Sequence, residues 1–217
     1  IVLKKGVKLG TSGSVNAAYF QGVYSTQTAG FNINKGAGKI NSYLNYQFTN
    51  RNNFESLNSD RFISTDSSLL SQRSYTTYPS MNNYISGGID YAISKKLNAS
   101  YDMRIILNNG NSYALNPIEI RNFETGVITG KNESDIDNSN ASTFIGNTLS
   151  TKYKIDSAGS EWTSQLEYNY YKNNNDQLYR NSSFLPAGNG VNGDGENRNR
   201  KDIFVLQTDL TLKLPKK

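Results

Sequence analysis

The clearest pattern in the chain is an alternation of apolar and polar residues on either side of Lys95-Lys96. In residues 83–94 and 97–108 the odd positions are mostly apolar and the even positions mostly polar. A period of two residues places each class of side chain on its own face of a β-strand. Each run is about twelve residues long, above the mean strand of ~5–6 and close to the ~9–11 that a tilted transmembrane strand needs. The two segments therefore predict a membrane-spanning β-hairpin.

The same alternation recurs along the chain and predicts an all-β fold. We expect eight strands, at about residues 12–24, 28–35, 39–50, 83–94, 97–108, 143–155, 161–172 and 203–214. The first two are the least regular. No window approaches eighteen consecutive apolar residues, and the mean hydropathy is −0.64, which excludes a transmembrane helix. A transmembrane β-barrel remains compatible with this composition, because only every second residue has to face lipid.

The connections between these strands differ in length according to the side of the sheet. Short turns are expected at residues 36–38, 95–96 and 156–160. Long polar loops are expected at residues 51–82, 109–142 and 173–202. Residues 25–27 form the one short connection expected on the side of these loops. This arrangement is typical of an antiparallel, up-and-down outer-membrane barrel with short periplasmic turns and long extracellular loops. A soluble sandwich or solenoid with polar insertions is the alternative.

Charge and aromatic residues fit the same geometry. The 217-residue chain has a formal charge of +5, but most lysines lie near the expected short turns, so we do not interpret the charge as a nucleic-acid site. Tyr91, Tyr153 and Trp162 lie toward the short turns and Tyr170 and Phe204 toward the other end, as in the aromatic girdles of a barrel. Ordinary cross-strand pairing of aromatic residues in a sheet is the alternative.

The candidate chemistry is binding and not catalysis. The chain has no Cys and no His, which removes disulfides, thiolate metal sites and the usual general base. Asp90, Asp102 and Arg104 occupy polar positions of the central hairpin, where Arg104 would offset the two carboxylates. We interpret them as a structural network of the lumen, and a substrate site is the alternative. Further candidates for ligand contact lie in the expected outer loops: Arg61, Tyr75, Tyr113, Arg121, Tyr179 and Arg180.

Two acidic segments suggest calcium ligands, but a plain solvated loop is the favoured interpretation. They are Glu133, Asp135 and Asp137, and the segment 192–197. Neither has the spacing of a complete calcium-binding loop with a terminal bidentate glutamate. We therefore expect no metal and no cofactor.

Several strings resemble the N-terminal part of the barrel in TonB-dependent outer-membrane receptors of the Bacteroidetes type. They are IVLKK at residues 1–5, SGSVNAAYFQG at 12–22, GKINSYLNYQFTNR at 38–51 and ISGGIDYAISKKLNASYDM at 85–103. The resemblance implies a barrel of twenty-two strands around an N-terminal plug in the outer membrane of a Gram-negative cell. Residues 1–11 would then be the end of the plug and the passage into the barrel, and residues 12–217 about the first eight strands.

The resemblance implies a transport receptor without enzymatic activity. Its wall and loops would bind a nutrient, such as a glycan, a peptide or a metal chelate, and the import would be energised through the TonB complex. The implied partners are outer-membrane lipids, the remaining barrel and plug, the TonB complex and a surface lipoprotein. A complete small eight-stranded barrel with a structural or adhesive role is the alternative. An outer-membrane hydrolase is disfavoured by the missing His.

Overall fold

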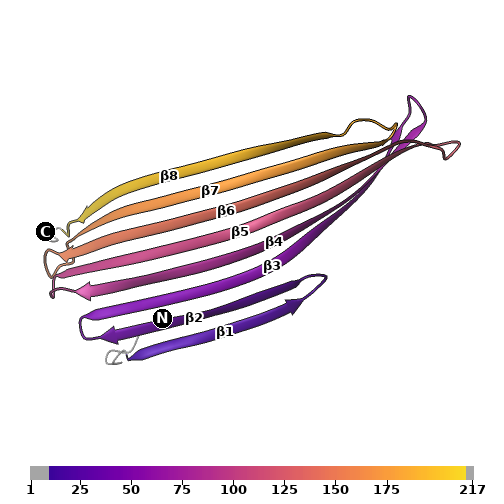
Figure 1. The fold of residues 1–217 in the computed structure, drawn as a ribbon. Coiled ribbons are helices and arrows are strands. Elements are labelled where there is room, and N and C mark those ends of the chain that lie inside the picture. The colour runs from indigo at the N-terminus through magenta and orange to yellow at the C-terminus, as the bar shows by residue number, and fades with distance from the viewer. Residues whose placement is uncertain (1–9, 214–217) are drawn as a thin grey trace.

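The computed structural model describes residues 10–213, which form one antiparallel sheet of eight strands (Figure 1). In chain order the strands are β1 (Thr11–Gln21), β2 (Ser25–Ala37), β3 (Ile40–Ile63), β4 (Ser68–Ala92), β5 (Leu97–Asn122), β6 (Ile128–Lys154), β7 (Glu161–Leu185) and β8 (Val191–Thr211). Their order in the sheet equals their order in the sequence. The predicted all-β, up-and-down arrangement of eight strands is confirmed. Most of the predicted plug segment, residues 1–9, lies outside the described residues.

The predicted long loops are wrong in their local structure, because they continue as strands. Residues 51–82, 109–142 and 173–202 belong almost entirely to β3–β4, β5–β6 and β7–β8, and only short tips join each pair. Once two strands are paired in register, each further residue pair satisfies its backbone hydrogen bonds without a new loop closure. These segments are rich in Asn and Ser, so apolar alternation did not reveal their pairing.

The register gathers the apolar residues of all eight strands on one face of the sheet. One transverse row joins Ile89, Tyr101, Leu149, Leu166 and Leu206, each directly opposite the next on β4 to β8. A parallel row runs through Val15, Phe31, Tyr46, Ile85, Ile105, Ile145 and Tyr170. On β7 the apolar band extends from Trp162 to Tyr170, which matches the ~9–11 residues of a tilted membrane-spanning strand.

The apolar face is uncovered. The residues of the row from Ile89 to Leu206 are 43–75% exposed, and residues 10–213 contain no buried hydrophobic side chain. A soluble sandwich or barrel would bury this face against a second layer, and no second layer is present among the described residues.

The described residues contain no helix that is long and apolar enough to span a bilayer.

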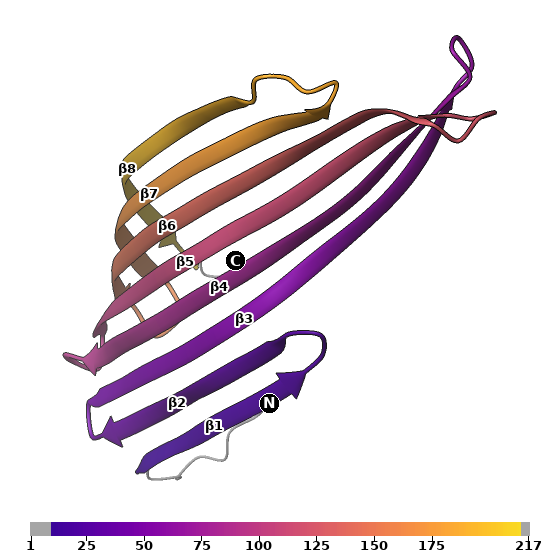
Figure 2. The same ribbon diagram turned by 45° about the vertical axis from the view of Figure 1, so that its right-hand side comes forward.

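The sheet is curved and open. Figure 2 shows β6, β7 and β8 curling out of the plane of β3 and β4, while β1 and β8 remain separate edges. Within residues 10–213, β1 pairs only with β2, and β8 pairs only with β7. Both figures also show that β1 and β2 end well before the tips of β3 to β6.

The turn between β6 and β7 is fixed by one aspartate. The Asp156 carboxylate accepts backbone hydrogen bonds from Ala158 at 2.8 Å and from Gly159 and Ser160 at 3.0 Å each. Gly159 has φ = 101°, a left-handed conformation that glycine adopts without steric cost. The hydrogen bonds from Ser160, by its side chain first and then its backbone, lower the pKa of Asp156 below its usual 3.8.

We predict that Asp156→Ala lowers the melting temperature of the complete protein, whereas Asp156→Asn, which keeps an acceptor oxygen, lowers it less. Because the folded pKa is depressed, the charge-dependent part of the stabilisation is present above the usual pKa and is lost as the pH falls through the folded value. Thermal unfolding followed between neutral and acidic pH measures both effects. Equal melting temperatures for wild type and Asp156→Ala at neutral pH would contradict the role of this turn.

Candidate functional site

The polar face of the sheet carries a hollow of about 400 Å³ that spans five strands. Its lining includes Tyr43 and Asn45 on β3, Tyr84 and Ser86 on β4, Asp102 and Arg104 on β5, Thr148 on β6, and Glu167 and Asn169 on β7. All these residues share the register phase opposite to the apolar rows. A hollow that crosses this many neighbouring strands marks the polar face as the inner side of the curved sheet.

Two cross-strand hydrogen bonds order the β3 side of this hollow. The Tyr43 hydroxyl donates to the Asp102 carboxylate at 2.6 Å, across the intervening strand β4. The Asn45 amide donates to the Ser86 hydroxyl at 3.1 Å, and Ser86 is only 7% exposed. The pair of Tyr43 and Asp102 therefore links β3 to β5 through side chains, across the intervening strand β4.

Gly88 allows the contact between Tyr43 and Asp102. It lies directly opposite both residues, between β3 and β5. A Cβ at Gly88 would meet the Asp102 Oδ1 and would lie 2.5 Å from Cε1 of the Tyr43 ring. The ring lies over the backbone of Gly88, so a side chain at this position would displace it.

Arg104 has a different partner from the one we expected. Within residues 10–213 its guanidinium forms no ion pair with Asp102; instead it lies over the Phe144 ring, 5.1 Å from the ring centroid. Its direct cross-strand neighbours, Ser86 and Gly146, are small and uncharged. The expected offset of the aspartates by Arg104 is therefore wrong, and the hydroxyl of Tyr43 takes the place beside Asp102.

A second hollow of about 600 Å³ lies farther toward the long hairpins and is lined mainly by amides and hydroxyls. One transverse row there joins Thr49, Asn82, Asn108, Ser142, Asn173 and Asn199. The Asn82 amide donates to the Asn108 oxygen, and the Asn108 amide donates to Ser142 at 3.2 Å. The Oδ1 of Asn173 is buried without a hydrogen-bond partner among the described residues. The row is uncharged, and it can donate and accept hydrogen bonds along its length.

The structure brings together only the three candidates from the central hairpin. Asp90 lies opposite Ser100, and Asp102 lies opposite Gly88 in the next residue pair on the same face. The predicted proximity of the two aspartates is therefore confirmed. Arg104 follows on the other side of Asp102 in the same face. Their role in binding a ligand stays a prediction.

The six candidates from the outer segments are dispersed over both faces of the hairpins. Arg61 and Tyr179 share the register phase of the polar face, while the strand positions of Tyr75, Tyr113, Arg121 and Arg180 have the opposite phase. Several have local structural partners. Tyr75 is hydrogen-bonded to Tyr24 at 3.1 Å, which raises its pKa, and Arg121 pairs with Glu119.

Tyr113 and Tyr179 also make local contacts. The Asn111 amide donates to the Tyr113 hydroxyl at 3.0 Å. The Tyr179 ring covers Gly193 on β8, where a Cβ would lie 2.5 Å from ring carbon Cε1. These contacts order the hairpins and do not form a common site.

Sequence reasoning missed Tyr43, Asn45 and the amide row as members of the inner face. The signal was present on β3, where Asn41, Tyr43, Asn45 and Gln47 alternate with Ile40, Leu44, Tyr46 and Phe48. Tyr43 occupies a polar-face position of β3, but sequence reasoning did not distinguish it from the tyrosines on the apolar face. The amide row lies in segments that we expected to be loops.

The acidic segments at 133–137 and 192–197 lie in β6 and β8 and not in loops. Among residues 10–213, no group of three or more acidic, Cys or His side chains is arranged to hold a metal ion.

Neither a family model nor a curated protein matches the chain. Among solved structures, the chain is similar to the RagAB peptide importer in its "closed-closed" state, with 8% identity and a TM-score of 0.41. For the "open-open" state the identity is 9% and the TM-score 0.43. Each match covers 86% of this chain and 30% of that chain. The chain thus spans less than a third of these structures, and similarity at this level assigns no family, ligand or partner.

We predict that Gly88→Ala destabilises the complete protein by about 1–3 kcal/mol, because the added methyl group displaces Tyr43 and disrupts its bond to Asp102. Gly110→Ala is the matched control on the same face, since its Cβ would meet the nearest atoms at an ordinary 3.7 Å. Denaturant unfolding in lipid vesicles measures both variants. Equal stability losses would show that the close contact at Gly88 does not constrain the sheet.

Proposed function

We propose that the chain forms part of the wall of an outer-membrane β-barrel that imports a nutrient. The observation that carries this proposal is the sheet with two unlike faces: an uncovered apolar band on one side and polar hollows on the other. Lipid covering the band would leave the polar face to line an aqueous interior. This is the division of faces found in transmembrane barrels.

The exposed area supports lipid as the covering medium. Soluble monomers rarely expose contiguous apolar patches larger than a few hundred Å², and larger patches mark contacts with proteins or membranes. Here the band crosses all eight strands, and its height fits a bilayer. Strands can cross hydrocarbon because their backbone groups are paired with neighbouring strands.

Two open edges support a barrel that is larger than eight strands. In lipid, the unpaired backbone groups of β1 and β8 would cost several kcal/mol each, so further strands must pair with them. We propose that these belong to a TonB-dependent receptor of the Bacteroidetes type. Its plug, the TonB complex and a surface lipoprotein would be the partners of the import cycle.

The proposed activity is binding and gated passage, without covalent chemistry. The hollows are lined by amides, hydroxyls, two guanidiniums and two carboxylates, which suit recognition of a polar solute such as a glycan, a peptide or a metal chelate. The second candidate, a closed eight-stranded barrel with an adhesive role, requires β1 to pair with β8. The separation of these edges favours the larger barrel.

We predict that Leu149→Arg costs the complete protein about 2–4 kcal/mol of stability in lipid vesicles, because the charge would face hydrocarbon. Thr148→Arg is the matched control on the opposite face of β6. Its guanidinium would lie between Asp102 and Glu167, which are its direct cross-strand neighbours. Denaturant titration in vesicles measures both. Equal tolerance of the two arginines would overturn the assignment of faces and the membrane location with it.

We further predict that Arg104→Leu reduces import at least about tenfold while leaving folding intact, since the exposed guanidinium holds no ion pair among the described residues. Growth of the host bacterium on glycans, peptides or metal chelates as the limiting nutrient measures import. Deletion of the gene shows which class of nutrient requires this protein for growth. Complementation with the wild-type or the Arg104→Leu gene then compares their import. Normal growth of the deletion strain on every class would contradict the import function.

A further inference from the structure

The upper part of β3 has a neighbouring strand on one side only. Pairing between β2 and β3 ends at Thr26 and Arg51, because the chain turns back between β1 and β2. Pairing between β3 and β4 continues to Ile63 and Ser68. The sheet therefore has a step, visible in Figure 1, above which β3 is an edge strand.

The direction of the unpaired groups follows from the hydrogen bonds at the base of β4. The Ala92 N–H donates to the Lys39 carbonyl at 2.8 Å, and these residues are directly opposite in register. Backbone groups alternate in direction along an antiparallel strand, so odd residues of β3 bond to β4 and even residues point away from it. Above the step, the N–H and C=O groups directed away from β4 are those of Phe54, Ser56, Asn58, Asp60 and Phe62.

Closure of a barrel does not cover this edge. A strand added beside β1 would lie three strand spacings from β3, or about 14 Å, since neighbouring strands are ~4.8 Å apart. The turn at residues 22–24 prevents β1 and β2 from continuing into the space. The edge thus stays unpaired whichever strands complete the sheet.

Apart from the charged side chains of Glu55, Asp60 and Arg61, this edge lacks the features that commonly protect free edges. Residues 52–63 contain no Pro and no Lys, and the pairing with β4 has no bulge, whereas the pairings of β5 with β6 and of β6 with β7 do. Its carboxylates are engaged with β4: Glu55 accepts from Tyr78 at 3.1 Å, and Asp60 pairs with Arg73 at 2.7 Å. The edge is therefore long, regular and open to strand addition.

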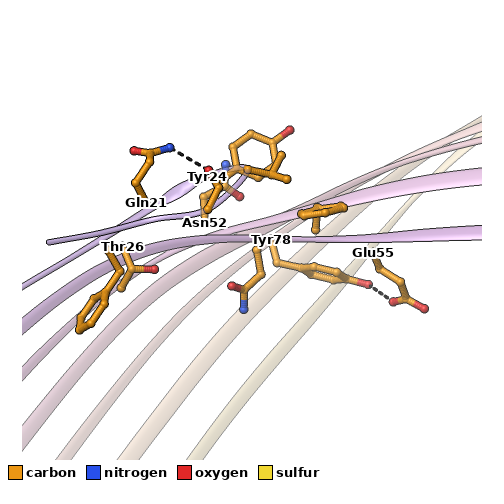
Figure 3. Close-up of a pocket in the computed structure, with 11 residues that line it drawn as sticks. Gln21, Tyr24, Thr26, Asn52, Glu55 and Tyr78 are labelled. Atoms are coloured by element: carbon orange, nitrogen blue, oxygen red, sulfur yellow. Dashed lines mark hydrogen bonds between the residues drawn. The ribbon is translucent and has the colours of Figure 1, made fainter.

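A hollow of about 640 Å³ lies at the step, between the β1–β2 turn and the start of the free edge (Figure 3). Phe20 and Val23, which are 61% and 65% exposed, offer it apolar surface. Asn52 lines the hollow, and its Oδ1 is buried without a hydrogen-bond partner among the described residues. An ordered water molecule would satisfy such an acceptor as well as a group of a partner, so strand addition to this edge does not depend on this oxygen.

We propose that an extended segment of a partner protein adds as a strand to β3 along residues 54–62, with one of its side chains in the hollow at the step. The hydrogen bonds of this edge run within the plane of the wall and not toward the polar face. A segment bound to this edge would therefore extend the wall sideways. This position favours a docked partner protein over a solute that passes along the polar face. Backbone pairing would supply affinity, and the hollow would select a side chain. The inference rests on the proposed function in one respect only: the proposed membrane position places residues 54–62 outside the bilayer.

Hydrogen exchange of the complete protein tests the proposal in native outer-membrane vesicles and after purification in detergent. We expect the amides of the five even residues to exchange at least about tenfold more slowly in the vesicles. Ser56→Pro removes one outward N–H and should abolish this protection, whereas Ser56→Ala should retain it. A denaturant titration shows that both variants are folded.

Each other occupant gives a different result, and each would overturn the proposal. Rapid exchange in both preparations means a free edge. Protection in detergent that disappears on dilution means pairing between two copies of this chain. Protection that appears only when peptide nutrients are supplied means a bound solute. Tolerance of Leu149→Arg would refute the membrane assignment separately, since that position lies on β6 within the apolar band.

Discussion

The fold depends on burial that the chain does not provide for itself. Residues 10–213 form a single layer without a buried hydrophobic side chain, although apolar burial is the main favourable term in folding. Moving one Leu or Ile side chain out of water contributes about 1.5–3 kcal/mol, and the apolar face carries apolar side chains on every strand, including Val15 on β1 and Leu206 on β8. A medium that covers this face must therefore be part of the folded state. In the proposed function this medium is lipid, and the polar face would then be the inside of the wall.

Within that constraint, the hairpins separate the tasks of insertion and recognition. The band from Trp162 to Tyr170 on β7 accounts for the bilayer, yet β7 continues to Leu185. The continuation has few large apolar residues and pairs mainly through its backbone and amide side chains, so it needs no lipid and no core. Because β1 and β2 lack such a continuation, the wall is uneven in height, and the edge of β3 is exposed.

The sequence alone predicted the strand phase well and the strand length poorly. The alternation of Ile89 with Asp90 and of Tyr101 with Asp102 was enough to assign faces, and the short turn at Lys95-Lys96 was enough to bring Asp90 near Asp102. Residues 51–82 have no such alternation, so their pairing became evident only from the register. Arg104 shows a second limit: its neighbours along the chain suggested an aspartate partner, but Phe144 comes from β6, whose register depends on a distant hairpin.

The register also orders the chemistry of the inner face along the strands. Beginning at the long hairpins, the face presents amides around Asn108 with Arg51 beside them, then the aromatic row of Tyr84 and Phe144, then Arg104, and then Asp102 beside Tyr43. A neutral hydrogen-bonding surface can hold a solute without selecting its charge, whereas a guanidinium followed by carboxylates discriminates by sign. In the proposed import path, a solute that enters from the hairpin side would meet amides and guanidiniums before it meets the carboxylates. Selectivity of the wall would then reside near Arg104, and capture near Asn108.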